Sequence, residues 1–207
     1  MNTAMKGRKL TEAERAAAIL PGRECGTCTL CCKVMRIDEL ESPAGQWCRH
    51  CIPGKGCGIH ETRPPVCREF FCMWTHRQDI GAHWKPEKSK MVLCLEGDGQ
   101  RIAAHVDPSF PGAWRRSPFY QELKKWSAIA AQAQTQVSVW IGRHAIVIVP
   151  DDDIDLGIVA EDEVVVSITT MTPQGPKLGA QKIKRSELPA LEKRWEAARR
   201  RQGIVGL

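Results

Sequence analysis

Residues 25–32 read Cys-Gly-Thr-Cys-Thr-Leu-Cys-Cys, and this run begins the part of the chain that decides its architecture. Nine of the ten cysteines lie between residues 25 and 72, at Cys25, Cys28, Cys31, Cys32, Cys48, Cys51, Cys57, Cys67 and Cys72. Thiols at this density indicate metal binding, disulfide bonds or thiol redox chemistry. The spacing and the composition decide among these three, and they make all nine cysteines candidate metal ligands.

The composition is that of a globular protein. Of the 207 residues, 43% are hydrophobic and 26% are charged, so the chain can bury a core as one domain or as two small ones. No apolar run approaches the roughly 20 residues of a membrane span. The first 20 residues carry charges where a secretory signal peptide has its apolar core. We therefore expect a cytoplasmic protein without membrane contact, whose cysteines stay reduced, and this favours metal over disulfides.

The spacing of the thiols points to metal chelation. A Cys-x2-Cys pair brings two sulfurs to one ion, because the turn between them places both side chains on the same side. A single pair is weak evidence, but this spacing occurs between Cys25 and Cys28, between Cys28 and Cys31, and between Cys48 and Cys51. Gly26 favours the tight turn that the first pair needs. A thioredoxin-like redox pair would require a βαβ context, and none is predicted around Cys25.

The adjacent cysteines at 31 and 32 indicate more than one metal position. If residues 25–28 begin a helical turn, Cys32 lies beside Cys28 and Cys31 points to one side. The pair can then serve two ions or one polynuclear site. Zinc and iron, including an iron–sulfur cluster, use thiolates at these spacings, so the metal stays open. Eight Gly or Pro residues from 43 to 65 also predict turns and a thin core, which a structural metal would stabilise.

The cysteine pattern resembles a known family. Cys25-x2-Cys28-x2-Cys31-Cys32 is followed by Cys57-Gly58-Ile59-His60-x2-Arg63-Pro64-x2-Cys67-Arg68 and by Cys72. This order is similar to that of the CxxCxxCC cysteine-cluster family, also called the YkgJ family, a zinc- or iron-chelating domain of small, mostly bacterial proteins. The resemblance covers residues 24–74 and implies metal chelation by the cysteines. It implies no settled activity, and it does not extend to residues 91–207.

The family pattern also indicates which nearby side chains are not ligands. The position of His60 is commonly aromatic in the family, so the Cys57-x2-His60 spacing is not expected to mark a ligand pair. His50 is a still weaker candidate. One of the nine thiols is expected to be spare, at Cys48 or Cys51, because only one of that pair matches the family's middle cysteine.

Residues outside the thiol set are expected to support it. Arg63 and Arg68 would brace the cysteine region by donating hydrogen bonds to sulfurs or to loop carbonyls. Four aromatic residues would cover the metal and exclude water, namely Trp47, Phe70, Phe71 and Trp74. The tenth cysteine, Cys94, lies in an apolar strand and is expected to be a buried small hydrophobe. His105 is expected to be an ordinary surface or core histidine.

The predicted fold class is α+β, with an irregular metal-stapled N-terminal module followed by a β-rich portion. We divide the chain into a helix or tail at 1–21, the Cys-rich module at 22–76 and the β-rich portion at 77–207; the last two form either separate domains or one body. The predicted helices lie at 11–20, 117–133 and 186–201. The predicted strands lie at 91–96, 101–106, 135–141, 144–149, 164–170 and 177–184. Residues 77–90 are read as a polar connector.

The function that the sequence favours is chelation of zinc or iron, with the metal mainly structural. The alternatives are an iron–sulfur protein with a redox or sensing role and a metal-dependent enzyme. The enzyme is the weaker alternative, because Glu61 and Glu69, the acids near the later cysteines, lie in no metalloenzyme motif, and no catalytic residue can be named. The partner is unknown. Eight bases against three acids in residues 181–201 allow a nucleic-acid contact, although a solvated helix face is the simpler interpretation.

Overall fold

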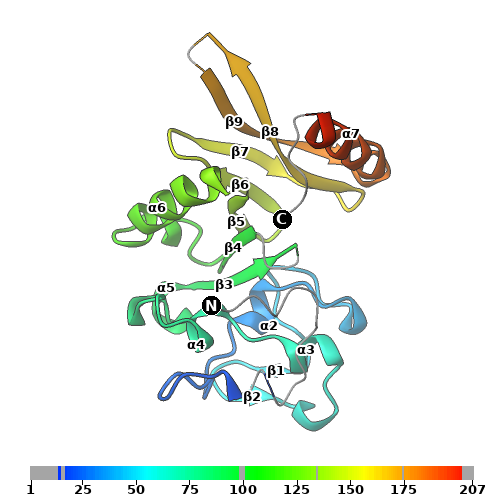
Figure 1. Ribbon diagram of the computed structural model, residues 1–207. Helices are drawn as coiled ribbons and strands as arrows, with labels where there is room; N and C mark the ends of the chain where they lie inside the picture. The colour runs from blue at the N-terminus through cyan, green and yellow to red at the C-terminus, as the bar shows by residue number, and fades with distance from the viewer. Residues whose placement is uncertain (1–13, 15–16, 98–100, 134, 174, 202–207) are drawn as a thin grey trace.

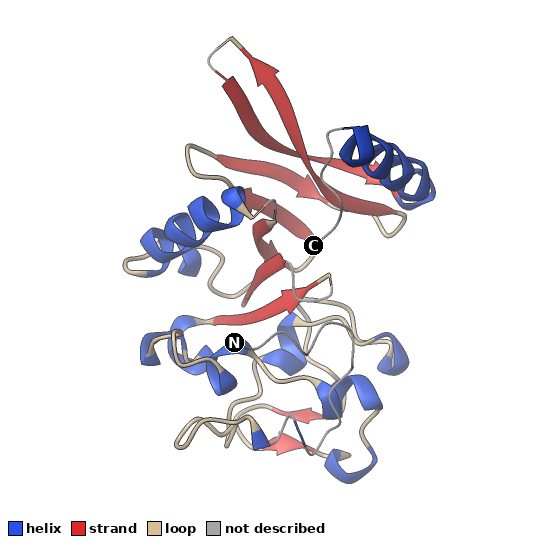
Figure 2. Cartoon of the chain, in the orientation of Figure 1, coloured by secondary structure: helices blue, strands red, loops and turns tan. Residues whose placement is uncertain are grey.

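The computed structural model describes residue 14 and residues 17–97, 101–133, 135–173 and 175–201. Helices and strands both occur, which confirms the α+β class (Figures 1 and 2). The N-terminal part contains α2 (Cys31–Val34), η1 (Asp38–Leu40), β1 (Cys51–Ile52), β2 (Gly56–Cys57), η2 (His60–Thr62), α3 (Pro65–Glu69), α4 (Met73–His76), η3 (Ala82–Trp84) and α5 (Pro86–Ser89). The remainder contains β3 (Met91–Glu96), β4 (Arg101–Val106), η4 (Ala113–Arg115), α6 (Phe119–Gln132), β5 (Gln136–Ile141), β6 (His144–Ile148), β7 (Asp153–Ile158), β8 (Glu163–Thr172), β9 (Gly175–Lys184), η5 (Arg185–Glu187) and α7 (Leu188–Arg201).

A five-stranded sheet in the order β3-β4-β5-β6-β7 is the centre of the fold. Its neighbouring strands are antiparallel except β4 and β5, which are parallel and are joined through α6. Such a parallel pair needs a crossover connection, and α6 supplies it. The helix packs on one face of the sheet, where Leu123 and Ala130 join Val137, Val139 and Ile148 in the main core. Both faces of β5 and β6 are covered, so these central strands are buried except at Trp140, Ile141 and His144, which are half-buried.

The β8–β9 hairpin packs on the opposite face of the sheet and extends beyond it (Figure 1). Val165 from β8 and Leu178 from β9 contact Ala145 and Val147 of β6 in a second hydrophobic cluster. The hairpin pairs over ten residues on each strand. Its base is therefore anchored by apolar burial, while α7 follows it at the C-terminal side.

The Cys-rich part packs against the edge strand β3, and the two share one core. Leu30 and Val34 beside α2, and Trp74 in α4, belong to the same buried cluster as Met91 and Leu93 of β3. Figure 1 shows β3 between the Cys-rich part and the rest of the sheet. An edge strand covered in this way cannot pair with another chain along its outer side, because the covering segments occupy it. The position of the cysteines is therefore fixed relative to the sheet.

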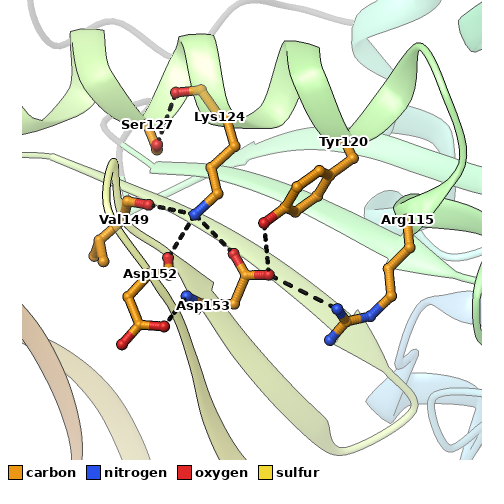
Figure 3. A network of polar contacts seen from close by, with 7 residues as sticks. All are labelled: Arg115, Tyr120, Lys124, Ser127, Val149, Asp152 and Asp153. Atoms are coloured by element: carbon orange, nitrogen blue, oxygen red, sulfur yellow. Dashed lines mark hydrogen bonds and ion pairs between the residues drawn. The ribbon is translucent and has the colours of Figure 1, made fainter.

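A polar network fixes α6 to the start of β7 (Figure 3). The Asp153 carboxylate accepts a hydrogen bond from the Tyr120 hydroxyl at 3.0 Å and lies 3.0 Å from the Lys124 ammonium. The same ammonium donates to the backbone carbonyls of Val149 and Asp152, each at 2.8 Å. Lys124 therefore satisfies two loop carbonyls and one partly buried carboxylate at once. This contact sets the angle at which the helix crosses the sheet.

The predicted elements agree with the structure in most places. The strands at 91–96 and 101–106 are confirmed to the residue, and α6 is two residues shorter at its start than predicted. The acidic run after residue 150 contains strand β7, which the sequence analysis did not predict. The connector at 77–90 contains η3 and α5, and the last α-helix begins at Leu188 rather than at Ser186. Most of the helix predicted at 11–20 lies outside the described residues.

Candidate metal centre

The first cysteines lie on a tight turn followed by a short helix. The Cys28 amide donates to the Cys25 carbonyl at 2.8 Å, and Gly26 between them has a φ of 53°, which favours glycine. Helix α2 then begins at Cys31 rather than at Cys25. The i, i+4 argument for Cys28 and Cys32 therefore does not hold, because residues 25–30 do not form a helical turn.

The Arg23 side chain joins the segment before the first of the nine thiols to the segment after the last. Arg23 Nη1 lies 2.9 Å from the Trp74 carbonyl, 3.0 Å from that of Arg77 and 2.8 Å from that of Ile80. The Leu20 amide also donates to a carbonyl of α4, that of Thr75, at 2.9 Å. These carbonyls follow Cys72 in the sequence, so the contacts, which we call the Arg23 strap, bring the two ends of the Cys-rich region together.

Four thiols form what we call the first thiol group: Cys25, Cys28, Cys31 and Cys72. Burial raises the pKa of Cys72 to about 11, and the negative charges of Cys25 and Cys28 raise it further. The hydrogen bond to Cys32 and burial raise the pKa of Cys31, and the charges of Cys25 and Cys28 act in the same direction. Because thiolate charges act strongly only at short range in a protein, these mutual effects place the four side chains in one neighbourhood. Four thiolates are the number that a closed zinc site or a four-iron cluster needs.

Five thiols form the second thiol group: Cys32, Cys48, Cys51, Cys57 and Cys67. Burial raises the pKa of Cys67 to about 11, and the charges of Cys32, Cys48 and Cys57 add to the effect. The backbone supports the grouping, since the Cys48 amide donates to the Cys32 carbonyl at 2.9 Å. Cys51 and Cys57 are paired across the β1–β2 ladder. The second group therefore gathers thiols from α2, from the β1–β2 ladder and from α3.

Cys32 lies where the two groups meet. Hydrogen bonds from the thiols of Cys31 and Cys51 lower the pKa of Cys32 to about 6, although burial acts in the opposite direction. These hydrogen bonds favour the thiolate at Cys32, the form that binds metals. Cys31 lies with the first group and Cys32 with the second, so the adjacent pair serves two neighbourhoods. The sequence analysis had placed Cys32 beside Cys28 on the condition that a helical turn begins at Cys25, and the helix begins at Cys31 instead.

The sulfur atoms are not drawn together to ligand distances. In a tetrahedral zinc site with Zn–S bonds of about 2.3 Å, neighbouring sulfurs lie about 3.8 Å apart. Within the described residues, the one set of three or more Cys, His, Asp or Glu ligand atoms that all lie within 4.8 Å of one another is Cys94, Glu96 and His105. The nine thiols fit a metal by donor chemistry and by grouping, since all are free thiols.

The supporting residues behave partly as predicted. Arg63 donates to the His60 carbonyl, and its positive charge opposes the burial that raises the pKa of Cys25. The His60 side chain is 63% exposed, and its Nδ1 lies 3.3 Å from a Glu61 oxygen rather than in a set of metal-ligand atoms. Trp74 is buried, but Trp47 remains 42% exposed and lies under the Lys33 ammonium. Trp47 therefore does not exclude water from the thiols.

The sequence analysis missed the convergence of three side chains on the β3–β4 hairpin. Cys94 is buried, as expected, with 5% of its surface exposed. Burial raises the pKa of the Cys94 thiol, and the charges of Glu96 and Cys72 add to this. His105 Nε2 lies 3.0 Å from Glu96 Oε1. The alternation of Cys94 and Glu96 on a predicted strand, with a histidine on the partner strand, was the signal that could have revealed the set.

Comparisons with known proteins found no match: no protein-family model, no curated protein and no solved structure matches this chain. No helix in the described part of the chain is long and apolar enough to cross a membrane. Metal binding is compatible with the ten free cysteines and with the Cys94–Glu96–His105 set.

Proposed function

We propose that this chain is a metal-binding protein whose nine clustered cysteines chelate zinc or iron, and that the metal is mainly structural. The first thiol group would hold one metal centre, and four thiols of the second group would hold another. The resemblance to the CxxCxxCC cysteine-cluster family is part of this proposal, and so is a reducing compartment such as the cytoplasm, since chelation needs free thiolates.

One observation supports the proposal: all nine thiols are free, and their charges act on one another in two overlapping sets, one around Cys72 and one around Cys67. Two sets are what two closed four-thiolate sites require, with one thiol spare. Cys48 or Cys51 remains our candidate for the spare thiol. The lowered pKa of Cys32 favours metal binding at this residue, because the thiolate is the form that binds metals.

The poor regular structure of this region explains why the metal would be structural. Between residues 31 and 69 the helices have three to five residues, and the strands β1 and β2 have two each. Segments of this kind bury little apolar surface and need another source of stability. A structural zinc contributes about 10–16 kcal/mol in small zinc peptides, which is as large as the whole stability of a typical domain.

The test is elemental analysis of protein purified without oxygen, together with its absorption spectrum. We compare the wild type with Cys25→Ser from the first group and Cys67→Ser from the second. Each variant should lose one metal centre, and the double variant should lose both. His60→Ala is the matched control, because this histidine has ligand-like spacing to Cys57 but is exposed. Unchanged metal content in both cysteine variants would overturn the proposal.

An iron–sulfur protein with a redox or sensing role is the second candidate. The four thiols of the first group favour it as much as they favour zinc, because four cysteines also ligate a cubane cluster. The same preparation separates the two. Iron with acid-labile sulfide and a broad band near about 400 nm would establish the cluster. Zinc in a colourless solution would support the first candidate, a protein whose metal is structural.

A further inference from the structure

Three side chains with different ligand atoms meet on one face of the β3–β4 hairpin. Cys94 and Glu96 alternate along β3 and so point to the same face, and His105 is paired with Val92 on that face of the ladder. The Cys94 sulfur, a Glu96 oxygen and a His105 nitrogen all lie within 4.8 Å of one another. No other set within the described residues reaches this density of ligand atoms.

The ladder explains how the three atoms reach one point. Ala103 faces Cys94 across the strands and lies between His105 and Arg101 on β4. Its methyl group leaves room for the longer Glu96 and His105 side chains to lean toward each other. The His105 ring is held from the neighbouring strand, where Trp140 stacks on it with 6.5 Å between ring centroids and 15° between planes. The ligand atoms therefore lie on paired strands, which hold a site more firmly than loops do.

The ligand set suits a borderline divalent ion. Zinc binds thiolate, imidazole and carboxylate together, and a thiolate with a carboxylate balances its two positive charges. In tetrahedral coordination at bond lengths of about 2.0–2.3 Å, neighbouring ligand atoms lie about 3.3–3.6 Å apart. The separation of His105 Nε2 and Glu96 Oε1, 3.0 Å, is close to that range. Three protein ligands leave a fourth position for water, which is the pattern of a zinc site that does chemistry.

Access to the set comes from the glutamate side. The Glu96 side chain is 31% exposed and that of His105 is 12% exposed, whereas Cys94 is buried. The Cys94 thiol is therefore the deepest of the three ligand groups, and the Glu96 carboxylate is the nearest to solvent. An ion pair between a histidine and a glutamate would explain two of the three positions, but it gives no reason for a cysteine at the same point.

We propose that Cys94, Glu96 and His105 bind a single zinc-type divalent ion, with one coordination position open to water and with no ligand from the nine clustered cysteines. This inference goes beyond the proposed function and does not depend on it. It makes the β3–β4 hairpin the place where a reactive metal could act, while the thiol groups hold structural ones.

The test is the zinc content of the full-length wild type, of His105→Ala and of Glu96→Gln, each after loading with Zn²⁺ and removal of the excess. Both variants should bind about one ion fewer per chain than the wild type. His144→Ala is the matched control, because His144 also pairs with a carboxylate, that of Asp155 at 2.5 Å, and belongs to no set of three ligand atoms within the described residues. Glu96→Gln keeps the size of the side chain, so it answers the question if His105→Ala fails to fold.

The outcomes separate this site from the cysteine clusters. If both hairpin variants keep the wild-type zinc content, or if His144→Ala loses as much as they do, the inference is wrong. A variant carrying Cys25→Ser and Cys67→Ser should still lose a further ion when His105→Ala is added. Loss in the hairpin variants with no loss in the cysteine variants would overturn the proposed function and leave this site standing.

Discussion

The ion pair between Lys33 and Asp107 allows a quantitative test of how the Cys-rich part is held on the sheet. Lys33 follows Cys32 directly, and its ammonium lies 2.6 Å from Asp107 Oδ1 in the loop after β4. The two side chains are only 11% and 9% exposed. The same ammonium lies 2.8 Å from the Ser109 hydroxyl. This contact therefore joins α2 to the sheet across more than 70 residues of chain.

We predict that Lys33→Met destabilises the protein by about 3 kcal/mol. Removing one partner of a buried pair costs about 3–5 kcal/mol, because the other charge is left without compensation. The lower end applies here, since Asp107 still accepts the Ser109 amide at 2.9 Å. For a chain of this size, about 3 kcal/mol corresponds to a fall in Tm of roughly 6–12 °C.

The stability lost in Lys33→Met should depend on pH. Burial acts to raise the pKa of Asp107, but the hydrogen bond and charge of Lys33 together with the hydrogen bonds from Ser109 outweigh it, so this pKa lies below its usual value. A depressed carboxyl pKa stabilises the folded state above the unfolded pKa of about 3.9 and loses that effect as the pH falls through the folded value. In Lys33→Met burial is opposed only by the hydrogen bonds from Ser109, so the ionised carboxylate loses most of its compensation at neutral pH. The difference between wild type and variant should therefore be large at pH 7 and small near pH 3.

The assay is urea denaturation at both pH values, on preparations of equal metal content. The set comprises Lys33→Met, Asp107→Asn and the double variant, which isolates the pairwise energy. Arg36→Met is the control, because Arg36 and its partner Asp38 are 54% and 74% exposed and should contribute little. A cost for Lys33→Met no larger than that of the control, or a deficit that is the same at both pH values, would refute the reasoning.

Three further predictions concern other parts of the fold. Asp153→Ala should lower the free energy of unfolding by about 1–3 kcal/mol, because Tyr120 and Lys124 lose their acceptor. Thermal unfolding measures this loss, and Tyr120→Phe should lower the free energy of unfolding by less. Arg23→Met should speed amide hydrogen exchange in residues 72–80, with exchange in β5 unchanged; equal protection there would mean that the strap contributes nothing. Removing metal with a chelator should broaden NMR signals from residues 22–76 before those of β6, and simultaneous loss would show instead that the two parts unfold together.

Local patterns predicted the strands well, because their signals lie within the strands themselves. The apolar run from Met91 to Glu96 is complete in the sequence, and so is that of its partner strand. Strand β7 was missed because Asp153 and Asp155 break the apolar pattern. These aspartates are tolerated since they pair with residues distant in sequence, namely Lys124 and His144. Only the assembled sheet provides those partners.

The candidate site was predictable in its residue types and not in its arrangement. The spacing of Cys25, Cys28 and Cys31 indicates chelation without any structure. The division of Cys31 and Cys32 between two neighbourhoods depends on where α2 begins, and helix boundaries are weakly encoded in such a short segment. The convergence of Glu96 and His105 on a thiol depends on side chains leaning along the ladder over a small residue, which periodicity does not describe.

The Arg23 strap has a consequence for how a metal would enter and leave the first thiol group. Joining the ends of a loop of about 48 residues costs on the order of 3.4 kcal/mol in chain entropy, by the logarithmic dependence on length. The hydrogen bonds of the strap, the stacking of Arg23 on Trp74 and the shared core offset this cost without a metal, so an ion would find Cys25 and Cys72 already held near each other. The affinity of the ion would then depend on the metal–ligand bonds and not on the entropy of closing the loop. An ion could also be exchanged there while the loop stays closed.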